Sequence, residues 1–221
     1  MSCPLCEKRK SVRFCPAKGE TICPVCCGTA REVTIDCPPG CAYLVAAHRY
    51  EDAHQRPVPA DTPFLGVDLP RDVIHTRQSL LEGLAFSIAK FAAAQPAAND
   101  PDVLAALQAL AETWKTLASG IHYERPPEAS AARALYSELT QFLREARQHE
   151  AGQPGLPPAV DRFAVTEIKD GEIFALLVFL YRMGLLRSNG RPRSRRFVEF
   201  LRSQFSQSPE LQRAEPRIIM P

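Results

Sequence analysis

The sequence of 221 residues has no apolar run long enough to cross a bilayer. Its longest uncharged, strongly apolar stretch extends from Ile173 to Tyr181, far short of the roughly 20 residues that a membrane-spanning helix needs. The first residues, MSCPLCEKRK, carry cysteines and charges where a secretory signal has its apolar core. We therefore predict a cytoplasmic protein with no secretory signal and no membrane partner.

The sequence also lacks the motifs of common enzymes. The segments GLPP and NGRPRS have neither the spacing nor the preceding strand of a glycine-rich phosphate loop. His75, His122 and His149 are isolated from one another, and no serine, cysteine or carboxylate stands at a spacing typical of a catalytic triad. These absences predict a protein that is not an enzyme.

Glycine is scarce relative to proline, with 11 glycines against 20 prolines, and the middle of the chain is rich in alanine. This composition favours helices joined by rigid connectors over a long β-sandwich. The formal net charge is only +2. If all eight cysteines bound two divalent ions as thiolates, the net charge would fall by four to −2. The net charge therefore predicts no general affinity for nucleic acid.

From position 70 onward, apolar residues recur every three or four positions, which predicts helices separated by proline and glycine. The most apolar segment, 172–186, should be the most buried helix. Residues 163–168 alternate weakly and fit a short strand or, as we prefer, the lead-in to that helix. The first predicted helix begins near Pro70 and ends before Gln95, and the second begins at a cap at Asn99 or Asp100 and ends near Gly120. The third follows a break at Pro126-Pro127, carries Leu135 on its apolar face and stops near Gly152. The fourth covers Glu172 to Leu186, and the last begins at a cap at Ser194 and ends near Phe205.

The predicted fold is mainly α, in two units. A small cysteine-rich zinc-binding module with a short β-hairpin occupies residues 1–56 and precedes a four- or five-helix bundle at 70–205. A stiff, proline-containing linker at 57–69 joins them, and a flexible tail follows at 206–221.

The cysteines are confined to the first unit, as CPLC, a lone cysteine, CPVCC and CPPGC. A two-residue gap lets both thiolates of a pair bind one tetrahedral ion, and zinc prefers thiolates. Because this segment has few large aliphatic side chains, bound metal must supply its folding free energy, on the order of 10 kcal/mol per site. The candidate zinc ligands are Cys3, Cys6, Cys15, Cys23, Cys26, Cys27, Cys37 and Cys41.

The spacing from Cys3 to Cys26 resembles that of a B-box type zinc finger. In order, the pattern is Cys3, two residues, Cys6, eight residues, Cys15, seven residues, Cys23, two residues and Cys26. B-box fingers are cross-braced modules that bind two zinc ions in ubiquitin-ligase and adaptor proteins. The resemblance covers residues 3–41 and implies a protein-interaction module. The chain also resembles bacterial proteins of unassigned function that begin in a similar way, and this second resemblance implies no activity.

The B-box resemblance also implies how the ligands divide between two zinc ions. The first and third pairs share one ion, which here gives Cys3, Cys6, Cys23 and Cys26. The second ion takes Cys15, Cys37 and Cys41, with the last two in place of the closing histidine pair of the family. Lys18 stands where the family has an aspartate ligand, and a protonated lysine cannot bind zinc, so Cys27 is the natural substitute.

Other interpretations of the cysteines remain open at this stage. A disulfide framework is disfavoured by a reducing compartment, and an iron–sulfur cluster by the proline-rich pairs. A catalytic zinc site would keep one position open, whereas eight cysteines for two ions leave none. His48 or His54 lies close enough in sequence to replace one cysteine, although a helix over Ala42–His54 also explains both.

We expect the chain to act as a structural zinc protein that binds an unidentified protein partner. The alternative is DNA or RNA binding, because the stretch from Arg182 to Arg202 contains seven arginines and a single acid, Glu199. The residues that would contact nucleic acid are Arg187, Arg191, Arg193, Arg195 and Arg196.

Overall fold

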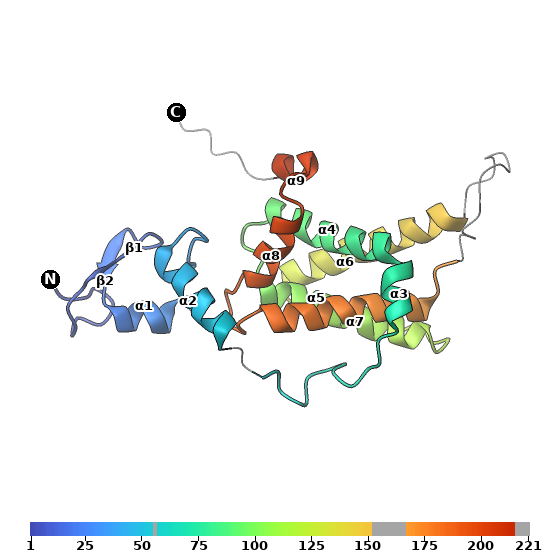
Figure 1. Cartoon of the computed structure of the whole chain (residues 1–221), viewed down its shortest axis with the longest axis horizontal. Helices are drawn as coiled ribbons and strands as arrows, with labels where there is room; N and C mark the ends of the chain where they lie inside the picture. Colours follow the sequence, from blue (N-terminus) through green and yellow to red (C-terminus); the bar gives the residue numbers. More distant parts are fainter. Residues whose placement is uncertain (55–56, 152–166, 215–221) are drawn as a thin grey trace.

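The computed structural model describes residues 1–54, 57–151 and 167–214. The chain is mainly helical, with one small antiparallel sheet of two strands in the described residues. The cysteine-rich unit, here called the head (residues 1–54), lies at one end of the long axis, and the remaining helices pack together as the bundle (residues 71–214) (Figure 1). Head and bundle have separate apolar cores.

The head contains the short hairpin that the sequence predicts. Its core is formed by two isoleucines and three cysteines: Cys3, Cys15, Ile22, Cys23 and Ile35. So few large apolar side chains bury too little surface to fold a segment of this length unaided. The elements of the head are β1 (Arg13–Cys15), β2 (Glu20–Ile22), α1 (Pro24–Ala30) and α2 (Ala42–Ala53).

The bundle is built around α7, which contacts α3, α5 and α8 and carries the most continuous set of buried apolar residues. The prediction that segment 172–186 is the most buried helix is not confirmed, because α7 buries eight of its 18 residues whereas α5 buries nine of 18. The elements of the bundle are α3 (Arg71–Thr76), α4 (Gln78–Ala94), α5 (Asp100–Leu117), α6 (Ser130–Ala151), α7 (Asp170–Arg187), α8 (Arg196–Gln204) and α9 (Pro209–Ala214).

Two helix ends were predicted differently from what the structure shows. The helix expected from Pro70 to Ala94 is divided into α3 and α4 at Arg77, which turns inward and donates to the Glu172 carboxylate of α7 at 3.0 Å. The Ser194 cap of α8 is wrong as well. The buried Asp100 carboxylate at the start of α5 accepts from the backbone N–H of Phe197 and Val198, both at 3.1 Å, and thereby caps α8 from another helix.

By contrast, the predicted cap of α5 is confirmed. The Asn99 side chain accepts from the N–H of Asp102 at 3.1 Å, and the Asp102 carboxylate accepts from the N–H of Asn99 at 3.2 Å. These two bonds form a capping box, which satisfies two backbone donors that a helix start otherwise leaves free.

The segments expected to be a linker and a flexible tail contact the bundle. Phe64 and Val67 pack against its core, and Arg182 of α7 donates to the Phe64 carbonyl at 3.0 Å. In the tail, α9 buries Leu211 against the bundle core. Of the segment 163–168, residues 163–166 lie outside the described residues. No helix in the described parts of the chain combines the length and apolarity needed to cross a membrane.

Candidate metal centre

Four cysteines of the head converge on one point. The sulfurs of Cys3, Cys6, Cys23 and Cys26 all lie within 4.8 Å of one another, and those of Cys6 and Cys23 are 3.9 Å apart. A tetrahedral zinc ion with Zn–S bonds of about 2.3 Å separates its sulfurs by about 3.8 Å. The donor set and its spacing therefore fit one zinc ion. We call these four residues the first cysteine set; they are the four that the B-box resemblance assigns to one ion.

Local backbone geometry places these sulfurs. In the first pair, the Cys3 carbonyl accepts from the N–H of Cys6 at 3.3 Å and of Glu7 at 2.7 Å, and Glu7 has a φ of 53°, which closes the turn. In the second pair, Cys23 caps α1, whose first residue is Pro24. The two turns are joined directly because the N–H of Cys23 donates to the Cys3 sulfur at 3.2 Å.

The electrostatics of the first cysteine set favour a bound cation. A backbone N–H bond from Lys8 is the main cause that lowers the pKa of Cys6 to about 6. The Cys26 pKa is raised to about 12, chiefly by its hydrogen bond with Cys23 and then by burial. Neighbouring thiolates repel one another, and Arg9 supplies one positive charge beside Cys6 and Cys23, too little to balance four thiolates. A divalent cation removes this conflict, because it stabilises all four thiolates together.

The other four cysteines line a small cavity. Cys15, Cys27, Cys37 and Cys41 all line a cavity of about 10 Å³ between the hairpin, α1 and the start of α2. Burial, then charge on Cys41, Glu32 and Cys15, raises the pKa of Cys37. We call these four residues the second cysteine set. Of the described residues, only the first cysteine set brings four such ligand atoms within 4.8 Å of one another, so the second set is gathered less tightly.

The division of Cys26 and Cys27 between the two sites follows from helix geometry. Both residues lie in α1, where successive side chains point about 100° apart around the axis. Cys26 therefore faces the other sulfurs of the first cysteine set, whereas Cys27 faces the cavity of the second cysteine set. All eight cysteines are free thiols in the structure.

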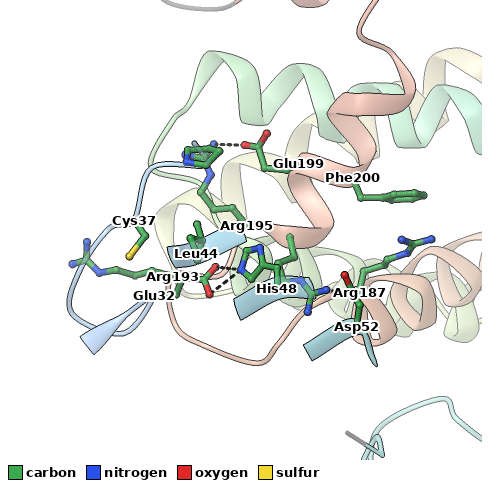
Figure 2. A pocket seen from close by; sticks show the side chains of 12 residues that line it. Glu32, Cys37, Leu44, His48, Asp52, Arg187, Arg193, Arg195, Glu199 and Phe200 are labelled. Atoms are coloured by element: carbon green, nitrogen blue, oxygen red, sulfur yellow. Dashed lines mark hydrogen bonds and ion pairs between the residues drawn. The ribbon is translucent and has the colours of Figure 1, made fainter. Parts of the chain in front are cut away.

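The two candidate histidine ligands have other contacts. His48 Nε2 lies 3.1 Å from both carboxylate oxygens of Glu32 (Figure 2). The His54 ring stacks on Tyr50, with 4.1 Å between ring centroids, and its Nδ1 lies 2.9 Å from the Tyr50 carbonyl oxygen. Lys18 is exposed in the turn of the hairpin and lines neither cysteine site.

Sequence reasoning missed Glu32, a buried residue of the head that contacts the bundle. Its side chain is only 3% exposed, and its carboxylate accepts from His48 of α2 and, at 2.8 Å, from Asn189 in the loop after α7. Its backbone carbonyl accepts from the Arg193 N–H at 2.8 Å. Burial opposes ionisation of Glu32, but the bonds from His48 and Asn189 prevail and lower its pKa. No local pattern marks this glutamate, because its partners are distant in sequence.

Most of the arginines proposed to contact nucleic acid are engaged within the chain. Arg191 donates to the Arg31 carbonyl of the head at 2.6 Å, and Arg196 pairs with Glu51 of α2 at 3.4 Å. Arg195 bonds to the Pro96 carbonyl and pairs with Glu199 at 3.7 Å. The remaining two, Arg187 and Arg193, are exposed. Three of the five therefore stabilise the fold, and two of those three join head to bundle.

Comparisons of the chain with protein-family models, with curated proteins and with solved structures found no match.

Proposed function

We propose that this protein is a non-enzymatic interaction module in which two structural zinc ions fold the head and hold it in a form that binds a partner protein. The observation that carries the proposal is the first cysteine set, whose four sulfurs have the spacing of one tetrahedral zinc site. Four thiolates fill the coordination sphere, which is typical of a structural site and leaves no position for a substrate. A reducing cytoplasm, which keeps thiols available for metal, suits such a site.

A second zinc ion is proposed at the second cysteine set. All four of its cysteines border the same small cavity, which is close in size to a single water molecule. Zinc binding would draw these four sulfurs closer together, because a metal site reaches its final geometry only when the ion binds. Cys27 also lines this cavity, which supports its use in place of the family's aspartate and a cross-braced pair of sites.

The interaction role is supported by the way the head is presented. Apolar side chains around the cysteines remain exposed, including Leu5 and Val25 within the two pairs of the first cysteine set and Phe14 of β1 at the cavity of the second. These side chains are not needed for the core of the head. An exposed apolar surface on a metal-held frame is typical of a protein-binding module.

Nucleic-acid binding remains the alternative, and it has less support. Three of its five arginines are occupied by carboxylates or carbonyls of the same chain, so few charges remain for phosphates. The two functions differ in salt dependence, because phosphate binding weakens steeply as salt rises.

Native mass spectrometry of the purified protein tests the metal proposal. We expect two zinc ions and no visible chromophore. Cys3→Ser and Cys41→Ser form a matched pair, because the same change is made in the first and in the second cysteine set. Each variant should lose one ion and keep the other. Loss of both ions from either variant would indicate one shared cluster, and visible absorbance would indicate iron.

The interaction proposal is tested by purification of the zinc-loaded chain with its bound proteins from the native host, with nuclease treatment as a control. A stoichiometric protein that survives nuclease and is lost from Cys3→Ser supports the proposal. Bound material that disappears with nuclease supports the alternative.

A further inference from the structure

A groove of about 300 Å³ lies between α2 of the head and α8 of the bundle. Its apolar floor is formed by Pro39 and Leu44 from the head and Phe200 from α8. Figure 2 shows Leu44 and His48 in its middle, with Arg193 and Arg187 at opposite ends. Since its walls come from both units, the groove exists only while the head is folded and docked.

The carboxylates that line the groove all have partners within the chain. Glu32 accepts from His48, Asp52 pairs with Arg196, and Glu199 pairs with Arg202 at 3.0 Å. None of the three is therefore available to balance a further cation.

The two arginines at the ends of the groove are in the opposite situation. Both are exposed, and within the described residues neither guanidinium has a hydrogen bond or an ion pair. Arg187 makes only a cation–π contact, with its guanidinium carbon 4.0 Å from the Phe200 ring centroid. The groove thus combines an apolar middle with an unbalanced positive charge at each end.

We infer that this groove binds an acidic peptide segment of a partner protein, with an apolar side chain over Pro39 and Leu44 and a carboxylate at each of Arg187 and Arg193. The inference rests on the proposed function as an interaction module and names the chemistry of its partner. Arginine suits this role because its planar guanidinium can hold a carboxylate through two parallel hydrogen bonds. Complementary charge at both ends would also fix the register of the bound segment.

The same groove is a poor site for nucleic acid. The face of Phe200 already carries Arg187, so it is not free to stack a base. Arg187 and Arg193 lie at opposite ends of the groove, so they form no continuous track for a phosphate backbone (Figure 2). An apolar floor with one cation at each end fits a peptide of mixed composition better than a chain with a charge on every unit.

Selection from a library of random twelve-residue peptides displayed on phage, with the zinc-loaded full chain as bait, tests this inference. We expect enriched peptides to carry Asp or Glu on both sides of an apolar residue. Synthetic copies should bind wild type, and their affinity should fall about tenfold or more in Arg187→Glu and in Arg193→Glu. Arg125→Glu is the matched control, because Arg125 is exposed before α6 and outside the groove. It should bind like wild type.

Arg187→Glu loses the contact with Phe200 and could be destabilised for that reason alone. Arg193→Glu has no such side effect, because the Arg193 guanidinium makes no hydrogen bond or ion pair in the described chain, so it keeps the test decisive. Three results would overturn the inference. The selected peptides show no enrichment of Asp or Glu, the peptide affinity is unchanged in both Arg187→Glu and Arg193→Glu, or a single-stranded oligonucleotide binds more tightly than the peptides at these arginines. Peptides that bind elsewhere on the chain would leave the interaction role intact and remove only the groove. A chain without zinc that still selects acidic peptides would remove only the metal proposal.

Discussion

Replacing Glu32 by alanine should loosen the head from the bundle without emptying the metal sites. Glu32 has a φ of 51°, in the left-handed region, where alanine and glutamate carry similar strain. The backbone bond from Arg193 to the residue-32 carbonyl is retained in the variant. The substitution therefore isolates the carboxylate and its two side-chain partners.

The expected cost follows from those partners. A hydrogen bond to a charged group contributes about 1.5–3 kcal/mol, and the Glu32 carboxylate accepts from both His48 and Asn189. His48 is 23% exposed, so water can replace part of its lost bond. We therefore expect a loss of about 2–4 kcal/mol in the free energy of unfolding. For a chain of this size, each 1 kcal/mol lowers the melting temperature by about 2–4 °C.

Differential scanning calorimetry of the zinc-loaded chain measures this effect. Because the cost falls on the contact between head and bundle, the unfolding curve of Glu32→Ala should begin at lower temperature and separate into two transitions. Glu20→Ala is the matched control, since Glu20 is an exposed acid of β2 in the same head. Zinc content should stay the same in both. If Glu32→Ala melts in a single transition at the same temperature as Glu20→Ala, the Glu32 carboxylate does not join the two units.

Three further predictions concern the metal sites and the bundle. Cys27→Ser should lose one zinc ion more readily than wild type, whereas Lys18→Ala should keep both, as measured by mass spectrometry during titration with a chelator; equal retention would make Cys27 a bystander. A strong chelator should unfold the head while circular dichroism keeps most of its helical signal, because the bundle has its own core; a cooperative loss of all helix would contradict this. Gly184→Ala should lower the free energy of unfolding in urea by about 1–3 kcal/mol, since the new methyl would lie 2.9 Å from the Phe197 ring, whereas Gly171→Ala on the same helix meets open space and should cost nothing.

The local features of this fold could be predicted from the sequence because they depend on residues a few positions apart. Apolar residues at helical spacing located the helices of the bundle, and the Asn99 capping box is formed by residues three apart. The spacing of the cysteines indicated a metal-binding head, because a pair separated by two residues can reach one ion whatever surrounds it. The division of the ligands into two sets came from the B-box resemblance rather than from the residues themselves.

Contacts between distant residues were decided only by the tertiary structure. Asp100 caps α8 by accepting from Phe197, 97 positions away, and Asn189 meets Glu32 across 157 positions. No periodicity records such pairs, because they depend on how the helices pack. Packing also determines what the arginines of residues 182–202 contact. Arg191, which the sequence alone presents as a free charge, donates to the Arg31 carbonyl of the head. The same docking leaves Arg187 and Arg193 exposed at the ends of the groove, without an ion pair to any carboxylate of the described chain.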